Sequence, residues 1–495
     1  MPIERMAPEP NPGETPTSVA GDFDEQAKLR ATEEGAEIVR PEGPAPAVIP
    51  TPGAAPAVAG DAGATNPDAP LRPTMSRQRT SAPGGRPSAE SATVERVRPG
   101  VAGPRPVRRE GEPGFGNAEL ARTETPTLER PQLSQPGTGG GVPAPYRLRG
   151  DTERKAATKQ FGGNAESERA VELSLKWLAA NQTLEGYWDA SAHEAGSTRV
   201  EDKTFPDVGK YADTGLSGLA LLAFLGRGHT LNSGQYRENV ERGLRWIVAQ
   251  QRDDGALGGG AGQTDFAYCH AMSAFALAEA YALSDKSAAD WLRLPVQRAI
   301  QFTIDSMTTD GGWRYRKGTA EGDMSIFGWQ LMAIKSAELG GITAPKSVHE
   351  RMVKFLIARS LGRDGGLAGY RTKDQPTPSM TAEALYCKQR LGISRDNPAC
   401  VEAVGYLQRY LPRRTQMNYY YWYYGSLAMR QYGGEEWTRW NDRLRDLLVQ
   451  DQIQSGALAG TWDPTDDWGR YGGRLYSTAL ATLCLEVYYR YGEQQ

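Results

Sequence analysis

Two kinds of apolar run alternate along residues 165–492. The first kind is amphipathic: in 168–182, Val171, Leu175 and Leu178 recur at helical spacing, while charged residues take the opposite face. The second kind, such as 213–228, is apolar nearly all round, which predicts a helix that is buried on every side. The alternation therefore predicts pairs of helices, one half-exposed and one buried.

This pairing occurs six times. The amphipathic runs are 168–182, 237–251, 295–307, 347–361, 400–411 and 437–452. The apolar runs that follow them are 213–228, 265–283, 323–339, 379–392, 418–434 and 474–492. No segment alternates apolar and polar residues for long enough to predict a sheet. Because repeats of this size bury their faces against their neighbours, we expect an all-α fold, an α6/α6 toroid with six outer helices around six inner ones.

A glycine follows most of the amphipathic runs. These markers are Gly186, Gly255, Gly311, Gly365 and Gly460. A glycine permits the backbone conformation that ends many helices. The aromatic residue that comes next, such as Trp188 in "NQTLEGYW", can cover the loop, and its N–H can bond a carbonyl that the helix end leaves free. We interpret the motif as a structural clasp that recurs because the architecture recurs.

Composition divides the chain into two parts. Most of the 33 prolines fall before residue 150, whereas all 11 tryptophans fall after residue 170. Before residue 160 the only aromatic residues are Phe23, Phe115 and Tyr146. A segment that can bury so little apolar surface cannot offset its ordering entropy. We therefore predict a disordered tail over 1–160 and the toroid over 161–495, and the sequence names no protein partner for the tail.

Charge and targeting signals point to no special environment. The net charge of −3 provides no general attraction for nucleic acid, so we expect no such partner. An acidic stretch (22–42) and an arginine-rich stretch (72–109) in the tail have no interleaved aromatic residues, which favours a solvated linker over a docking segment. We expect neither a signal peptide nor a transmembrane helix, and a cytoplasmic location. The four cysteines, Cys269, Cys387, Cys400 and Cys484, lie mostly in apolar runs, as suits buried thiols.

The spacing of one clasp resembles that of a known family. Gln182-x-x-x-Gly186-x-Trp188 matches the QW motif of squalene and oxidosqualene cyclases in full, and 251–257, "DGGW" at 310–313 and "DGGL" at 364–367 match it in part. Residues 165–492 thus resemble the prenyltransferase/squalene-oxidase repeat superfamily, and the ending "GGRLYSTALATLCLEVYYRY" is similar to that of uncharacterised bacterial toroid proteins. The resemblance implies a squalene cyclase-like α/α toroid with a cavity for an isoprenoid ligand.

The signatures of that superfamily's known reactions are missing. The proton-donating D-x-D-D of class II terpene cyclases is absent, and the nearest run, Asp463, Asp466 and Asp467, has the spacing D-x-x-D-D. Prenyltransferases bind zinc through Asp, Cys and a distant His, whereas 265–270 reads D-x-x-x-C-H. The thioester sequence G-C-G-E-Q of the superfamily's complement-like members is missing too. We therefore expect no metal and no cofactor, and whether the protein is an enzyme stays open.

Three aspartates are the candidate catalytic residues. Asp213, Asp265 and Asp323 open the first three apolar runs. Since parallel inner helices bring their N-termini to one rim, these carboxylates can meet there as acid/base or cation-binding groups. The alternative is ordinary helix N-capping, for which Asp is favoured. Helix N-termini stabilise a charged carboxylate, so we expect these aspartates to be ionised rather than strong proton donors.

Aromatic and basic residues are the candidate ligand-binding groups. The run "NYYYWYYG" (418–425) places consecutive aromatic residues around an inner helix, so some of them must face the central cavity. The candidates are Tyr420, Tyr421, Trp422, Tyr423, Tyr424, Trp329 and Arg474. Arg314, Arg316, Lys317, Arg470 and Arg474 flank starts of inner runs and can bind an anion or pair with the nearby aspartates. The alternative for the aromatic residues is packing between the two helical rings.

Three functions remain open from the sequence. The first is binding of an elongated apolar or isoprenoid-like ligand in an aromatic-lined central cavity. The second is a terpene cyclase or prenyl-transfer enzyme with rearranged acids. The third is a non-catalytic protein-interaction scaffold whose centre is filled by aromatic side chains. A glycan-processing toroid is a weaker fourth, since acids and aromatic residues line such sites too.

Overall fold

The computed structural model describes residues 142–196, 208–466 and 468–492. Residues 1–141, most of the predicted tail, lie outside the described residues, so the prediction of disorder is not tested there. No helix in the described ranges is long and apolar enough to cross a membrane.

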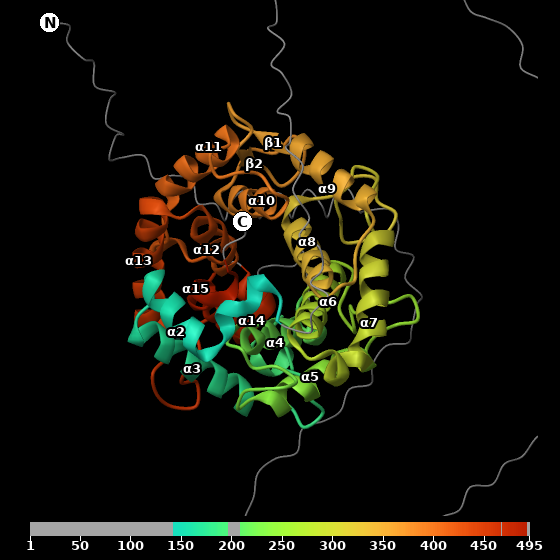
Figure 1. Ribbon diagram of the computed structural model, residues 1–495, viewed down its shortest axis with the longest axis vertical. Coiled ribbons are helices and arrows are strands. Elements are labelled where there is room, and N and C mark those ends of the chain that lie inside the picture. Colours follow the sequence, from blue (N-terminus) through green and yellow to red (C-terminus); the bar gives the residue numbers. More distant parts are fainter. Residues whose placement is uncertain (1–141, 197–207, 467, 493–495) are drawn as a thin grey trace, which may run out of the picture. The chain divides into compact units, whose positions relative to one another are not determined.

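Twelve of the described helices form two concentric rings (Figure 1). The outer helices are α3 (Ala165–Ala180), α5 (Arg237–Ala249), α7 (Lys286–Asp305), α9 (Lys346–Ala358), α11 (Pro398–Leu407) and α13 (Gly434–Asp451). The inner helices are α4 (Asp213–Gly226), α6 (Phe266–Leu283), α8 (Met324–Leu339), α10 (Pro378–Arg390), α12 (Tyr419–Tyr432) and α14 (Gly469–Leu485). Each inner helix packs on the next, and α14 packs on α4. The predicted α6/α6 toroid is confirmed.

The apolar pattern explains which helices are inside. In α5, the buried residues Val240, Gly243, Leu244 and Ile247 form one stripe. In α4, every residue after Asp213 is buried. A helix with one apolar stripe can cover a core, whereas one that is apolar all round must be surrounded. The sequence pattern therefore sorts the helices into rings.

Short elements connect the rings. They are the 3-10 helices η2 (Ser191–His193), η3 (Gln408–Tyr410) and η4 (Arg414–Gln416), and a hairpin of β1 (Ser360–Leu361) and β2 (Leu367–Ala368). Helix α7 differs from its prediction, because it begins at Lys286 and continues through Pro295 instead of starting there.

The clasp after α3 joins this outer helix to the next one, α5. Trp188 is fully buried, and its Nε1 donates to the carbonyl of Leu178 near the end of α3 (2.7 Å). Gln182 Nε2 donates to the carbonyl of Gly186 in its own turn (2.7 Å) and to that of Asn239 in α5 (2.9 Å). The predicted bond from the tryptophan to a helix carbonyl is confirmed.

The predicted boundary of the tail at residue 160 is wrong. Residues 144–160 form η1 (Ala144–Arg149) and α2 (Asp151–Gln160), which pack against α15 (Val487–Arg490). We call 144–160 the N-terminal arm. Tyr146 Oη donates to Ser336 Oγ (3.0 Å) near the end of α8, so the arm lies at the C-terminal ends of the inner helices. Composition missed the arm because its attachment depends on a few buried side chains, among them Tyr146 and Arg149.

The arm completes a buried ion cluster. The guanidinium of Arg149 donates to Glu279 Oε1 (2.9 Å) and to the carbonyl of Leu225 (3.1 Å). Arg490 also pairs with Glu279 (3.1 Å) and with Glu486 (3.7 Å). Two arginines thus balance two glutamates in an almost fully buried position, which is the condition under which buried charges are tolerated.

Candidate functional site

The three candidate aspartates bind three different segments. Asp213 Oδ1 accepts from the backbone N–H of Ala190 (2.8 Å), and Asp265 Oδ2 accepts from that of Gly209 (2.9 Å). Asp323 caps α8, since its Oδ1 accepts from the N–H of Ile326. The N-cap alternative therefore holds for Asp323, while the other two carboxylates hold loops in place.

Burial raises the pKa of Asp213 and of Asp265. This direction is opposite to the one expected from helix N-termini, and the ionisation of the two carboxylates stays a prediction. Neither side chain caps its own helix, so the favourable dipole contact is weak and loss of hydration decides the direction.

Helix α12 presents its aromatic residues to two sides. Tyr421 faces outward: its Oη donates to the carbonyl of Tyr410 (2.9 Å), and its ring meets that of Trp440 in α13 edge-on. Tyr423 stacks on Trp329 of α8, with ring centroids 5.3 Å apart, and Tyr424 meets the same ring edge-on.

These contacts fill the interior of the ring at this level. In the ring of inner helices, α10 lies between α8 and α12 (Figure 1). Side chains of α8 and α12 can therefore meet only across the interior. Trp329, Tyr423 and Tyr424 are fully buried there. Three of the candidate aromatic residues, Trp329, Tyr423 and Tyr424, thus face inward and pack against one another.

A buried glutamate, Glu383 of α10, lies among these aromatic residues. Its Oε1 accepts from the N–H of Gly328 in α8 (2.7 Å), and its Oε2 is hydrogen-bonded to Tyr420 Oη of α12. Burial, with the nearby charge of Asp323 as a smaller cause, raises the pKa of Glu383 well above its usual range. The group joins three inner helices.

Ser325 links Glu383 to the candidate residue Asp323. The Ser325 hydroxyl donates to Asp323 Oδ1 (2.8 Å), and Tyr268 Oη of α6 lies 2.5 Å from the same hydroxyl. The carbonyl of Ser325 accepts from Tyr420 Oη (2.7 Å). Asp323 and Glu383 are therefore connected through Ser325 and Tyr420, a connection that the sequence did not predict.

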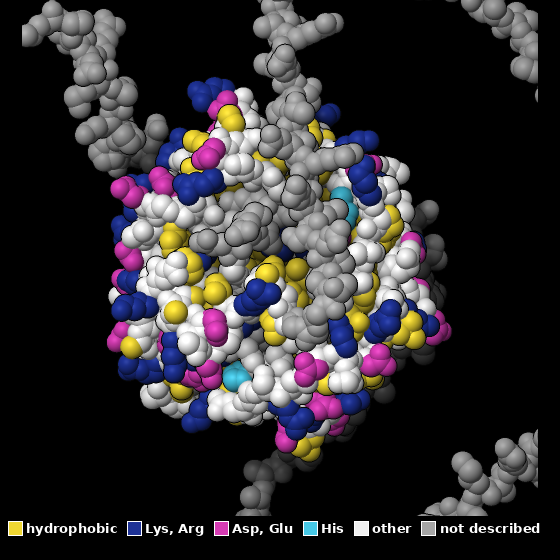
Figure 2. Space-filling view, in the orientation of Figure 1, with side chains coloured by type: hydrophobic (Ala, Val, Ile, Leu, Met, Phe, Trp, Pro, Cys, Tyr) yellow, Lys and Arg dark blue, Asp and Glu magenta, His cyan; other side chains and the backbone are white. Residues whose placement is uncertain are grey.

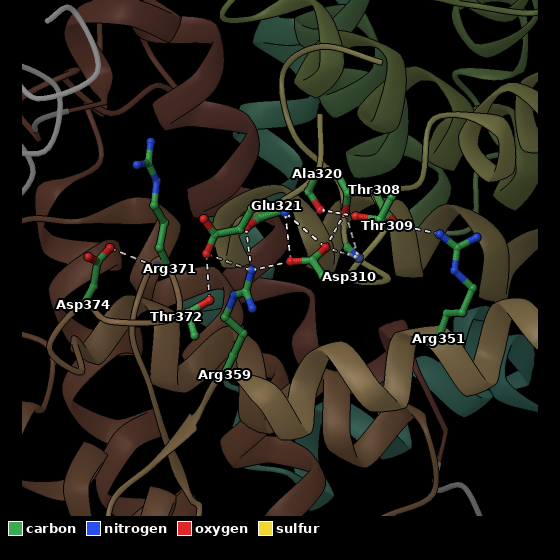
Figure 3. A network of polar contacts seen from close by, with 12 residues as sticks. Thr308, Thr309, Asp310, Ala320, Glu321, Arg351, Arg359, Arg371, Thr372 and Asp374 are labelled. Carbon is green, nitrogen blue, oxygen red and sulfur yellow. Dashed lines mark hydrogen bonds and ion pairs between the residues drawn. The ribbon is translucent and has the colours of Figure 1, made fainter. Parts of the chain in front are cut away.

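A polar network fixes the loop that leads to Asp323 (Figure 3). Asp310 accepts from the N–H of Gly322 (3.1 Å) and from the guanidinium of Arg359 (2.7 Å). Arg359 also donates to the carbonyl of Gly322 (2.8 Å), and Glu321 accepts from the hydroxyl of Thr372 (2.7 Å). These bonds hold 308–322 in place, so Asp323 starts α8 from a rigid loop.

A cavity of about 610 Å³ opens at the N-terminal end of α12, and we call it the rim cavity. Its aromatic and apolar lining includes Pro378, Tyr410, Leu411, Met417, Tyr419, Tyr421 and Trp422. Its charged lining residues are Arg414, Asp451, Asp463 and Asp466. The candidates Tyr421 and Trp422 thus contribute to this cavity rather than to the centre of the ring.

The candidate anion-binding residue Arg474 is paired. Its guanidinium contacts Asp463 Oδ1 at 2.7 Å and Glu194 Oε2 at 2.8 Å, and its side chain is mostly buried. Two carboxylates therefore already neutralise it, as the pairing alternative expected.

His270 and Cys269 occupy structural positions. His270 Nδ1 accepts from the N–H of Leu257 (3.1 Å), and Nε2 bonds Thr303 Oγ1 (2.9 Å). Burial raises the pKa of the Cys269 thiol. Over the described ranges, no group of three or more His, Cys, Asp or Glu side chains is arranged to hold a metal ion.

Glu383 is the residue that sequence reasoning missed. It sits inside the apolar run 379–392, while the search for acids considered only the starts of the runs. A charged residue within a helix that must be surrounded is rare unless it has a dedicated partner. The position of Glu383 inside such a run was therefore the feature from which the sequence could have identified it.

Comparisons with known proteins find matches among solved structures. No protein-family model and no curated protein sequence matches the chain. Among solved structures, the chain is similar to the type II terpene cyclase MstE from Scytonema (14% identity, TM-score 0.42, 66% of this chain and 98% of that chain). It is also similar to an inactive variant of an α-1,6-mannanase from Salegentibacter in complex with α-1,6-mannotriose (10%, TM-score 0.46, 66% and 99%). At such identities the likeness concerns the α/α toroid fold alone.

Proposed function

We propose that the protein binds an elongated apolar, isoprenoid-like molecule in the rim cavity, not in the centre of the ring. The supporting observation is the contrast between these two places. The interior between α8 and α12 is occupied by Trp329, Tyr423 and Tyr424, whereas the rim cavity has about 610 Å³ and a wall in which aromatic and apolar residues stand beside polar and charged ones. Small-molecule sites have volumes of about 300–1,000 Å³, and their apolar side chains are combined with polar groups that orient the ligand.

The charges of the rim cavity indicate the kind of head group. Three aspartates line it against one arginine, Arg414, which is already paired with Asp451. An anionic head such as a diphosphate would meet like charge there and would find no unpaired arginine. We therefore expect a neutral head group, with the apolar chain lying along Tyr419, Tyr421 and Trp422.

The test is isothermal titration calorimetry of the full chain with farnesol and with farnesyl diphosphate. We expect farnesol to bind at least tenfold more tightly than the diphosphate. The variant Thr415→Trp places a large ring on an exposed position of the cavity wall and should weaken farnesol binding at least tenfold. Thr438→Trp, on an exposed face of α13 outside the cavity, is the control and should bind farnesol as the parent does. Equal binding of both ligands, or an unchanged affinity in Thr415→Trp, would contradict the proposal.

A non-catalytic interaction scaffold is the second candidate. The observation that favours it is the filled interior, because a ring packed by its own aromatic residues is rigid without any ligand. The same titration separates the two candidates, since a scaffold should give no heat with farnesol. A cyclase with rearranged acids has less support, because Asp213, Asp265 and Asp323 are each engaged by a different segment.

A further inference from the structure

Tyr420 has more oxygen partners than it has hydrogens. Its hydroxyl oxygen is hydrogen-bonded to the carbonyl of Ser325 (2.7 Å) and to Glu383 Oε2. A carbonyl can only accept, so the single hydroxyl hydrogen of Tyr420 satisfies Ser325. The second contact then needs a hydrogen from Glu383. An ionised carboxylate has none, whereas a neutral carboxylic acid does.

The other oxygen of Glu383 agrees with this assignment. Oε1 accepts from the N–H of Gly328 and therefore is the unprotonated oxygen. The side chain is fully buried, and burial favours the neutral form of a carboxyl group, in line with its raised pKa. The hydrogen bonds thus run in one direction, from Glu383 to Tyr420 and from Tyr420 to its acceptor.

The surrounding wall contains buried donors that lack an acceptor. Within the described residues, Tyr424 Oη and Trp329 Nε1 have no hydrogen-bond partner, and both side chains are fully buried. Tyr424 Oη and Glu383 Oε1 both lie 2.6 Å from the point that a Cβ on Gly328 would occupy. Buried donors are nearly always satisfied in proteins. This wall is therefore suited to an oxygen atom that accepts hydrogen bonds.

This wall lies next to the rim cavity. Ser379 lines the cavity, and Glu383 follows it on the same face of α10, one turn further into the ring. Tyr419 and Tyr421, the neighbours of Tyr420, also line the cavity. Tyr420 and Glu383 lie behind the cavity's lining residues; Tyr420 is 8% exposed and Glu383 is 0% exposed, so the tyrosine is the more accessible of the two.

We propose that Tyr420 is a ligand-binding residue that donates a hydrogen bond to the oxygen of a neutral alcohol or carbonyl, and that Glu383 is its positioning residue. The ligand oxygen replaces the Ser325 carbonyl as the acceptor of Tyr420. Glu383 donates to the tyrosine oxygen and polarises its O–H, because consecutive hydrogen bonds strengthen one another. The inference rests on the proposed function, since it names the end group of the ligand that enters the rim cavity.

The first test compares farnesol with farnesene, which has the same chain and no oxygen, by calorimetry or by competition with a fluorescent ligand. Tyr420→Phe should weaken farnesol about tenfold, the usual size of one hydrogen bond, and leave farnesene unchanged. Glu383→Met should weaken farnesol similarly. Glu383→Gln, whose amide still donates to Tyr420, should restore farnesol binding to within about threefold of the parent. Equal losses for farnesol and farnesene, or no rescue by Glu383→Gln, would overturn the proposal.

The second test observes Glu383 directly by infrared spectroscopy at pH 7. A neutral Glu383 gives a carboxylic-acid C=O band that shifts in D₂O, disappears in Glu383→Gln and moves when farnesol binds. Glu486→Gln changes a distant buried glutamate and should leave the farnesol-sensitive band in place. Absence of a band that depends on Glu383, or a band that farnesol does not move, overturns the inference while rim-cavity binding can persist. Failure of farnesol to bind at all overturns the proposed function instead, and the band then reports only on the free protein.

Discussion

Individual glycines set how closely the outer helices can approach one another. Gly186 has φ of +108°, and a Cβ there would lie 2.6 Å from the carbonyl oxygen of Arg242 in α5. Gly341 also has a positive φ, +88°, but a Cβ there would have no heavy atom within 4 Å. The two positions share the backbone strain of a substitution and differ in the space around it.

This contrast gives a prediction for two alanine variants. Gly341→Ala should cost about 1–2 kcal/mol of unfolding free energy, from the left-handed backbone alone. Gly186→Ala should cost about 1–3 kcal/mol more, because α5 must also move away. Urea denaturation followed by circular dichroism measures both. Similar losses in the two variants would mean that the contact with α5 is not tight.

The buried histidine His270 makes stability depend on pH. Its Nδ1 must stay unprotonated to accept from Leu257, and burial lowers its pKa to about 3. An unfolded histidine has a pKa of about 6.5. Since the folded pKa is depressed, this contribution to stability is complete above pH 6.5 and is lost as the pH falls from 6.5 towards 3.

His270→Gln should reduce that acid loss. Between pH 7 and pH 5, the parent should lose about 2 kcal/mol through this group, at about 1.4 kcal/mol per pH unit below 6.5. The variant should lose correspondingly less over the same interval. Chemical denaturation at the two pH values gives the difference. An equal acid loss in the parent and in His270→Gln would contradict the prediction.

At the residue scale, the sequence predicted where a residue lies in a helix better than it predicted which residues its side chain contacts. Asp323 was correctly placed at the start of an inner helix, because capping depends on local sequence. Its link through Ser325 to Glu383 could not be predicted, since it depends on how three helices separated by long stretches of sequence pack together. Which residues meet is determined by the direction in which each side chain leaves its helix.

At the scale of elements, the twelve helices follow from the apolar pattern and the arm does not. The first inner helix was expected over 213–228 and is found over Asp213–Gly226. Residues 144–160 have no comparable stripe, because the arm is held mainly through a few specific contacts. Periodicity detects an element that buries a continuous face, and it misses one that is fixed by single buried groups.

The arm should be important for stability through Arg149. Replacing it with methionine keeps much of the volume but leaves Glu279 and Glu486 with Arg490 as the remaining arginine of the cluster. Breaking a buried pair on one side costs about 3–5 kcal/mol. Arg149→Met should therefore lower the unfolding free energy by about that amount in urea denaturation. Arg147→Met, on the exposed side of the same 3-10 helix, should change it little, and equal effects would show that the cluster is not the cause.

At the scale of the whole molecule, the last pair of helices is joined to the first. Gln452, after α13, donates through Nε2 to the carbonyl of Ala170 in α3 (2.8 Å), just as Gln182 reaches from α3 to α5. The carbonyl of Gly460 in the same turn accepts from Gln452 too (3.2 Å). The connection between neighbouring outer helices is thus repeated where the two ends of the helical region meet.

This seam means that no pair of helices stands at an end with a single neighbour. An open array of repeats can fray from its terminal units, which need special capping. Here, releasing any one pair requires two seams to break at once, so partial opening is costly everywhere around the circle. Which pair comes first along the chain then depends only on where the ends of the helical region lie. A circularly permuted gene that begins at another loop would encode the same ring of helix pairs.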